Sequence, residues 1–314
     1  MAFILGWLLL FSIKAPGPWL DANTAHFQLR YPLALEKTAQ DLKEHLEPIR
    51  SAILADLSAP DPGAVLVILA PDRETFFALQ PPGVPNWASG TSYPGARTIF
   101  LKPLDAREIR ANTLPGIFAH ELAHLILRER LRGTSPPRWL DEGIANRYGR
   151  SLSWDFPGPL MEVGITGNFI PWADLADGFP ETGPQAHLAY AQSTDFIQFL
   201  IKTYGPAAFA RFLDRLAAGE ELDPALTAGF GRDLAPLSAA WQRRVRWTYG
   251  LIGLLTGGIT LWFAMAWLLI WAYARKRKTS RLRKELWDLE DRAAAEEHSA
   301  PDPEESPPET RTYH

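Results

Sequence analysis

The chain has 314 residues, 46% of them hydrophobic, so it can bury a sizeable core in one domain of about 200 residues with further segments attached. Its formal net charge of −4 combines a basic stretch at residues 275–284 with an acidic one at 285–309. The large central region has no basic face, which argues against nucleic acid as a partner. The lack of cysteine excludes disulfides, thiolate nucleophiles and cysteine-rich metal sites.

The N-terminus contains an apolar run at residues 3–13. This run is too short to cross a bilayer as a straight helix and is typical of the hydrophobic core of a signal peptide. No lysine or arginine precedes it, and no small-x-small cleavage site precedes Asp21. We expect residues 1–22 to form a signal peptide or an N-terminal hydrophobic anchor, with a buried terminal strand as the alternative.

The first part of the next region predicts a small mixed sheet. Residues 26–31 alternate between apolar and polar side chains as a strand does, and residues 33–57 have apolar positions at helical spacing. Residues 65–69 form a short apolar run between turn residues, which predicts a buried strand.

Pro94 and Gly95 suit a tight turn between two antiparallel strands, at residues 87–92 and 97–101. The first of these strands is rich in small polar residues and is expected at the edge of the sheet. The sequence thus predicts an α+β domain over residues 23–246, in which a small mixed sheet with an antiparallel edge hairpin packs on the helices that follow it.

Two helices follow the hairpin. Asn112 or Thr113 can cap the first, which has Pro115 in its first turn and Gly133 at its end. Residues 139–148 form the second.

Residues 151–185 are rich in glycine and proline and are expected to form an irregular loop over the active-site cleft. Helices are then predicted to return and to form a mainly helical lobe, at residues 188–203, 206–218, 222–229 and 235–246.

The first helix carries the run His120-Glu121-Leu122-Ala123-His124. Because residues four apart lie on one face of a helix, His120 and His124 can bind one ion at about 2.0–2.1 Å. Glu121 lies beside them, where it can accept a proton from an activated water and pass it to a leaving amine. The apolar residues around the run argue against two ordinary surface histidines.

A catalytic zinc site uses three protein ligands and keeps a further position open. Glu142 on the second helix is the expected third ligand, because its small neighbours Gly143 and Ala145 permit a close approach of the helices. His187 is the alternative. Asn146, one turn after Glu142, is a candidate to hydrogen-bond the outer nitrogen of a ligand histidine.

Residues 247–274 contain no charged side chain over 28 positions, which predicts a transmembrane helix with aromatic residues at both ends. A buried core helix is the alternative, but it would need the same length with no polar face. The basic cluster at residues 275–284 is larger than the one before the helix, and the larger cluster stays in the cytoplasm. Residues 275–314 are therefore expected to form a cytoplasmic basic helix and a disordered acidic tail.

The region from residue 26 to residue 244 resembles gluzincin metallopeptidases of the thermolysin superfamily, particularly the bacterial peptidase-MA-like domains. The motifs that carry the resemblance are His120-Glu121-x-x-His124, Trp139-Leu140-x-Glu142-Gly143-x-Ala145, Ala189-Tyr190-Ala191-Gln192-Ser193, Phe196-Ile197-Gln198-Phe199-Leu200 and Tyr204-Gly205. The resemblance implies zinc peptidase chemistry, with His120, His124 and Glu142 as Zn2+ ligands and Glu121 as the general base.

The resemblance also implies a donor that stabilises the oxyanion formed when water attacks a carbonyl. Tyr190 matches the family position, and His187 is the second candidate. Residues 186–190 contain no further polar group to orient the Tyr190 hydroxyl. In the resembling superfamily, peptides lie along a strand edge, which would be residues 87–92 or 97–101 here.

These observations predict a membrane-anchored zinc metallopeptidase acting on a peptide or protein substrate. The expected location is the bacterial cell membrane, with a single span, an extracytoplasmic catalytic domain and a cytoplasmic tail. The alternative is a membrane-anchored binding or scaffolding module that keeps the fold without catalysis. A third possibility is that residues 275–314 carry the main role by recruiting a cytoplasmic partner.

Overall fold

The computed structural model describes residues 17–104, 113–149, 158–180, 183–250 and 258–299. By its internal contacts the chain forms two compact units, residues 1–253 and residues 254–314. The predicted N-terminal apolar run at residues 3–13 lies outside the described residues, as does the tail from residue 300 onward.

The first unit contains a five-stranded mixed sheet in the order β1-β2-β3-β5-β4. The three central strands are parallel, and each outer strand pairs antiparallel to its neighbour. The sheet confirms the predicted α+β class and mixed strand directions. Its strands are β1 (Trp19–Asn23), β2 (Phe27–Pro32), β3 (Val65–Leu69), β4 (Gly90–Tyr93) and β5 (Thr98–Leu101). Strand β1 thus begins inside the segment 1–22 that was expected to precede the domain.

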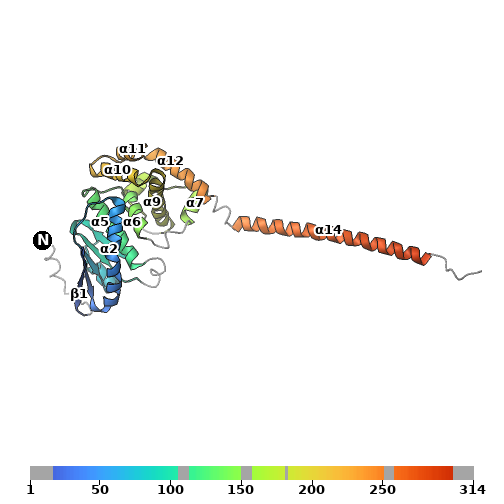
Figure 1. Ribbon diagram of the computed structural model, residues 1–314, viewed down its shortest axis with the longest axis horizontal. Coiled ribbons are helices and arrows are strands. Elements are labelled where there is room, and N and C mark those ends of the chain that lie inside the picture. The colour runs from blue at the N-terminus through green and yellow to red at the C-terminus, as the bar shows by residue number, and fades with distance from the viewer. Residues whose placement is uncertain (1–16, 105–112, 150–157, 181–182, 251–257, 300–314) are drawn as a thin grey trace, which may run out of the picture. The chain divides into compact units, whose positions relative to one another are not determined.

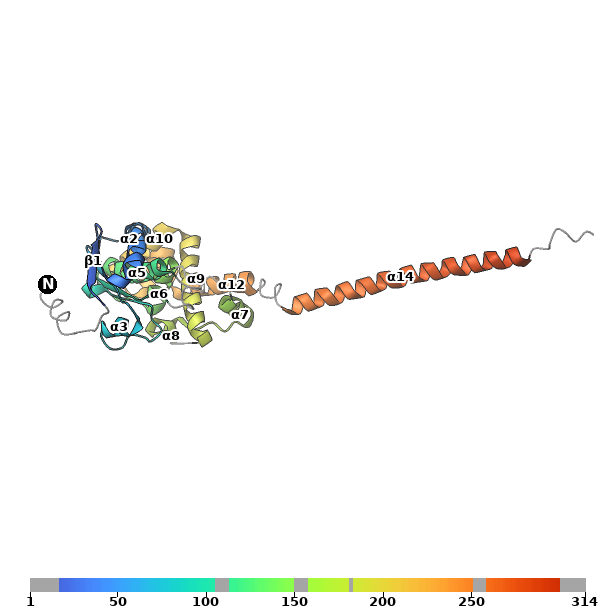
Figure 2. The same cartoon turned by 90° about the horizontal axis from the view of Figure 1, so that it is seen from below.

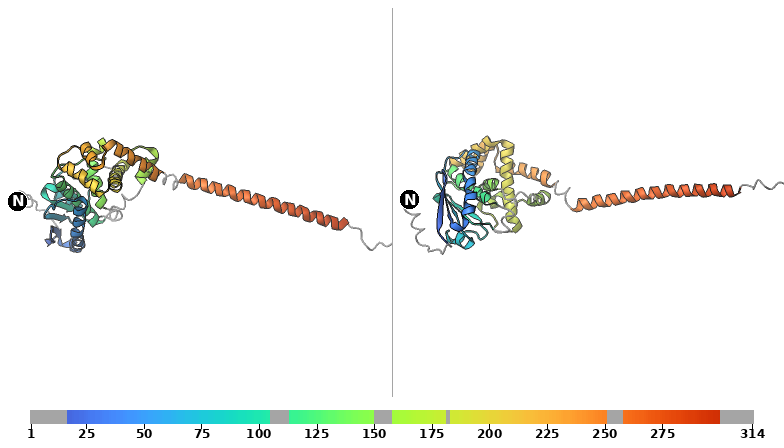
Figure 3. Two further views of the ribbon diagram at one scale, coloured as in Figure 1. Left: turned by 45° about the horizontal axis from the view of Figure 1, so that its top comes forward. Right: turned by 60° about the horizontal axis from the view of Figure 1, so that its bottom comes forward.

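One face of the sheet is covered by two long helices that run side by side, α2 (Glu36–Leu57) and α5 (Leu114–Arg130) (Figures 1 and 3). Alternation along β2 turns Phe27 and Leu29 into the core, where the Phe27 ring meets Phe118 of α5 edge-on. Each large apolar side chain buried here stabilises the fold by about 1.5–3 kcal/mol. This packing fixes α5 against the sheet.

The hairpin of β4 and β5 shows which of the two predicted hairpin strands lies at the edge of the sheet. Strand β5 lies between β3 and β4, with Ile99 paired to Val67 on one side and to Ser92 on the other. Residues 97–101 therefore offer no free edge, and β4 is the outer strand on this side. The short helical turn η2 (Pro94–Ala96) joins the two strands at the predicted turn residues.

The other helices of the first unit form the predicted mainly helical lobe, in which α9 lies along α6 (Figure 2). Its centre is a cluster of aromatic rings, in which Trp139 packs edge-on to Trp172, and both contact Phe196. The helices are α6 (Arg138–Tyr148), α7 (Gly158–Thr166), α8 (Trp172–Asp177), α9 (Gly183–Tyr204), α10 (Pro206–Ala217), α11 (Leu222–Phe230) and α12 (Leu234–Val245), with a short helix α3 (Arg73–Ala78) after β3.

The prediction of an irregular loop at residues 151–185 was partly wrong. Helices α7 and α8 occupy much of it, and α9 begins at Gly183, before the expected start. Glycine and proline lie at the ends of these helices, as Pro171 does at the N-cap of α8, and do not interrupt them. Residues 150–157 and 181–182 lie outside the described part of the chain.

The second unit contains α14 (Gly258–Ser299), which continues through the stretch expected to be a basic helix. A short π-helical turn, η3 (Arg246–Gly250), follows α12, and residues 251–257 lie outside the described part. No helix formed by the described residues is long and apolar enough to cross a membrane. The predicted membrane span at 247–274 is therefore not supported by this part of the chain.

The contact between α6 and α9 depends on a glycine. A Cβ atom at Gly143 would lie 2.7 Å from the carbonyl oxygen of Ser193 and 2.8 Å from the Ile197 side chain. Because Ser193 presents backbone at this point, the helices would have to move apart to admit a side chain. Gly143 therefore permits a close approach to α9, whereas the sequence predicted only a close approach of the metal-carrying helices.

We expect Gly143→Ala to lower the free energy of unfolding by about 1–3 kcal/mol, because the added methyl group overpacks this contact. Urea unfolding of the two proteins measures the difference. The control is Gly158→Ala, at the exposed start of α7, where an added Cβ meets no atom within 4 Å. Equal stability of the wild type and Gly143→Ala would contradict the tight contact.

Candidate metal centre

Helix α5 places its two histidines on one face. Thr113 caps the helix by accepting a hydrogen bond from the backbone N–H of Gly116, and Pro115 lies in the first turn, as predicted. The Nε2 atoms of His120 and His124 are 3.1 Å apart, and the two rings meet edge-on. Both imidazoles thus direct a nitrogen to the same point.

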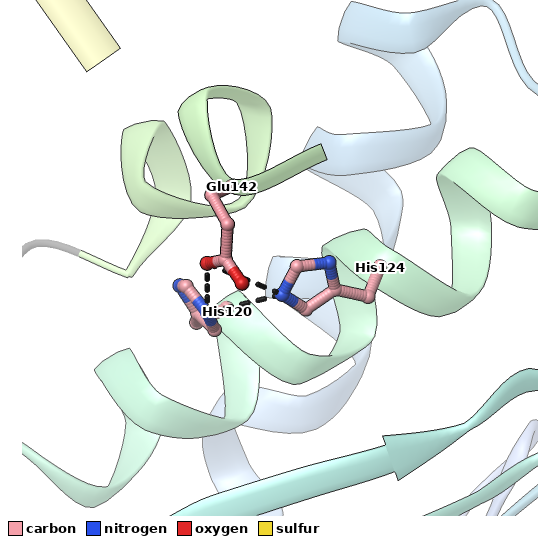
Figure 4. A group of neighbouring side chains, drawn as sticks. All are labelled: His120, His124 and Glu142. Atoms are coloured by element: carbon pink, nitrogen blue, oxygen red, sulfur yellow. Dashed lines mark hydrogen bonds and ion pairs between the residues drawn. The ribbon is translucent and has the colours of Figure 1, made fainter. Parts of the chain in front are cut away.

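Glu142 reaches this point from α6 (Figure 4). Its Oε2 atom lies 3.5 Å from His120 Nε2 and 3.8 Å from His124 Nε2. A tetrahedral zinc with ligands at about 2.0–2.2 Å separates its donor atoms by roughly 3.3–3.6 Å. The three observed separations lie close to that range, so these side chains could hold one metal ion. Among the described residues, the group does not include His187, which is exposed on α9.

The surroundings of the Glu142 carboxylate favour a bound cation at this point. Its Oε2 atom is buried and has no hydrogen-bond partner, although a buried polar atom without a partner is costly. The donor set of two nitrogens and one carboxylate oxygen is one that zinc accepts. The residues therefore fit the metal that the sequence predicts.

Asp141 orients one of the ligands, and the sequence analysis missed it. Its Oδ1 atom lies 2.7 Å from His124 Nδ1, so the Nδ1–H can donate to the carboxylate while Nε2 keeps its lone pair for a metal. The sequence predicted this role for Asn146, but it is Asp141 that holds the outer nitrogen of His124, and the buried Nδ2 atom of Asn146 has no hydrogen-bond partner. The signal in the sequence that could have indicated this role is an acidic residue, Asp141, directly before the ligand Glu142.

The carboxylates keep the centre charged even without a metal. Burial acts to lower the pKa of His124, but the charge and hydrogen bond of Asp141, with the charges of Glu142 and Glu121, outweigh it and raise the pKa to about 9. Burial acts to raise the pKa of Glu142, but its contact with His120 at 3.5 Å and the nearby charges of His124 and Arg138 lower it to about 2. A protonated His124 therefore faces an ionised Glu142 in the metal-free protein.

Glu121 lies between the metal ligands and the sheet edge. Its side chain is 7% exposed, and a Cβ atom at Gly90 of β4 would come within 2.9 Å of Glu121 Cγ and 3.1 Å of its Oε1. The backbone of the outer strand thus passes directly beside this carboxylate. A peptide strand added along β4 would bring its own backbone next to Glu121.

Tyr190 belongs to the same centre, and an orienting group comes from another helix. Burial and the charge of Glu142 raise its pKa above the ordinary tyrosine value, while a hydrogen bond with Arg138 acts in the opposite direction. Its ring packs edge-on against Phe179. Apart from His187, residues 186–190 contain no polar neighbour of Tyr190, and Arg138 lies on α6.

Zinc binding to this centre should release protons, because zinc needs the neutral imidazole of His124. The pKa of about 9 is above the ordinary 6.5, so the stabilising effect of protonated His124 is complete below pH 6.5 and is lost as pH rises through 9. At pH 7 we expect release of about one proton per zinc bound, and an affinity that increases towards pH 9.

Isothermal titration of the metal-stripped protein with zinc, in two buffers of different ionisation enthalpy, measures the proton release. Asp141→Asn should reduce the release at pH 7, because it removes the charge that most raises the pKa of His124. An affinity that does not change between pH 6 and pH 9 would contradict this account.

Comparisons with known proteins identify the family to which this chain belongs. The family model described as Peptidase MA superfamily matches residues 81–247, which is more than half of the chain. A structure of yeast LTA4 hydrolase in complex with bestatin is similar at a TM-score of 0.41 and 14% identity, over 78% of this chain and 39% of that chain. The chain thus corresponds to well under half of that protein's length. No match was found among curated proteins. By the match over residues 81–247, the chain belongs to the Peptidase MA superfamily.

Proposed function

We propose that this protein is a zinc-dependent peptidase whose metal ligands are His120, His124 and Glu142. The observation that carries the proposal is the convergence of three donor atoms at separations of 3.1, 3.5 and 3.8 Å, with a buried carboxylate oxygen that has no other partner. Membership of the Peptidase MA superfamily supports peptides or proteins as the substrate class.

A zinc ion held there would lower the pKa of a water molecule to about 7 and polarise a carbonyl group. Glu121 is buried next to the ligands, so its carboxylate can take a proton from the attacking water and deliver it to the leaving amine. The Tyr190 hydroxyl donates a hydrogen bond to the substrate oxygen as negative charge develops on it. The substrate backbone lies along β4, beside Gly90 and Glu121.

Two substitutions distinguish the role of the general base from that of the metal ligands. Glu121→Gln should keep stoichiometric zinc but lose peptide hydrolysis by a factor of about 10² or more, because the amide cannot accept the proton. His120→Ala should lose both zinc and activity, because it removes one of the three donors. Metal analysis of the purified proteins and single-turnover cleavage of a peptide library measure the two properties.

His45→Ala is the matched control for His120→Ala, since His45 lies on α2, where its Nδ1 atom is 2.9 Å from the Asp41 carbonyl oxygen. It should keep both zinc and activity. Undiminished hydrolysis by Glu121→Gln would reject Glu121 as the base. A cellular function that survives Glu121→Gln would favour the binding or scaffolding module.

We also propose attachment to the bacterial cell membrane through residues 247–274, with the metal centre outside and the tail in the cytoplasm. The support is the uncharged sequence of this stretch, part of which, 251–257, lies outside the described residues. Helix α14 also exposes large apolar side chains with no polar face between them, at Trp262, Phe263, Trp267, Leu268, Leu269, Ile270, Trp271 and Tyr273.

Fusions of alkaline phosphatase test this topology, because the enzyme folds only outside the cytoplasm. A fusion after Arg244 should be active and one after Lys284 inactive, since the larger basic cluster at residues 275–284 stays inside. Activity after both residues, or release of the protein by carbonate washing, would reject membrane attachment in this orientation.

A further inference from the structure

Arg138 contacts the metal centre from the first position of α6, and the chemistry proposed above leaves it without a role. One of its guanidinium nitrogens lies 2.7 Å from Glu142 Oε1, and its side chain is 47% exposed while that of Glu142 is 5% exposed. Tyr190 of α9 also lies near enough to raise the pKa of Arg138. The guanidinium therefore lies between two helices, with one edge on the third metal ligand.

The position of Arg138 is unfavourable for the helix itself. A cation in the first turn opposes the helix dipole, at a cost of about 0.3–1 kcal/mol. The order of the pair is also the weaker one, because an acidic residue placed four residues before a basic one stabilises a helix better than the reverse. The benefit of Arg138 must then come from pairing the buried Glu142 carboxylate with a charge and from its neighbour Tyr190 on α9.

The two oxygens of Glu142 have separate partners. Oε1 forms the ion pair with the Arg138 guanidinium, while Oε2 points between the two imidazoles and has no hydrogen-bond partner. A carboxylate free on both oxygens can turn and bind a metal through either or both of them. With Oε1 held by a charged donor, Oε2 alone is left for the metal.

We propose that Arg138 is a positioning residue that holds Glu142 as a single-oxygen ligand, so that the metal keeps an open position for water or substrate. This inference rests on the metal centre of the proposed function. Tyr190 and Glu142 together fix the guanidinium between α9 and α6. A lysine could replace the charge but not the planar fork that reaches both partners.

The experiment compares wild type, Arg138→Gln and Arg138→Lys after chelator treatment and loading with zinc or cobalt. Loss of the guanidinium should weaken zinc binding by about 10–100-fold, as removal of a group that orients a ligand does. Cobalt reports its coordination number by its visible absorption, which is intense for four ligands and weaker for five. Arg138→Gln should show the weaker band, because Glu142 then binds by both oxygens, and Arg138→Lys should recover part of the affinity.

Arg147→Gln is the control, since Arg147 lies on the same helix and pairs with Asp56 at 3.1 Å, away from the centre. It should leave the zinc affinity and the cobalt spectrum unchanged, and thermal unfolding of all variants checks that each folds. Wild-type affinity and spectrum in Arg138→Gln would overturn the role of Arg138. Because neither readout needs turnover, absence of peptidase activity would reject the proposed function alone, whereas a wild type that binds no metal would reject both.

Discussion

The ionised carboxylate of Glu142 is the constraint on which the rest of the centre depends. A buried carboxylate is costly unless charges and hydrogen bonds compensate it, and here burial alone would raise its pKa. The two imidazoles and the Arg138 guanidinium supply that compensation on opposite sides of the group. Removal of any of them leaves a buried charge less well paired. The histidines of α5 and the glutamate of α6 therefore stabilise each other before a metal is considered.

Helix α6 links this electrostatic requirement to the packing of the domain. Arg138, Asp141 and Glu142 lie within its first turns and all contact the centre, while Gly143, the next residue, contacts α9. The register of α6 is fixed from outside the centre by the buried ring of Trp139, which packs against Trp172 and Phe196. A rotation or shift of this helix would displace three functional side chains at once. The aromatic cluster of the helical lobe thus helps to set the geometry of the charged site through the register of α6.

The metal ligands could be predicted from the sequence because helical spacing places His120 and His124 together whatever the rest of the chain does. The prediction of Glu142 as the third ligand required only that a second helix return alongside the first. Strands β2, β3 and β5 were also predictable, because their apolar residues end at turn residues, whereas β1 lies in a segment that was expected to precede the domain. Asp141 and Arg138 could not be assigned in this way, since their contacts depend on how α6 is rotated against α5 and α9. The helices within residues 151–185 were missed because glycine and proline at helix ends resemble the composition of a loop.

The arrangement separates the conformational cost of metal binding from its electrostatic cost. The three donor atoms already lie at separations close to those of a tetrahedral site, so little movement is needed. The proton on His124, held there by a pKa raised to about 9, must leave instead. Exchange of one proton for a divalent ion adds a single positive charge among Asp141, Glu142 and Glu121. The carboxylates that retain the proton in the metal-free protein are therefore the groups that favour its replacement by zinc, and the proposed role of Arg138 is to leave a single oxygen of Glu142 for the metal.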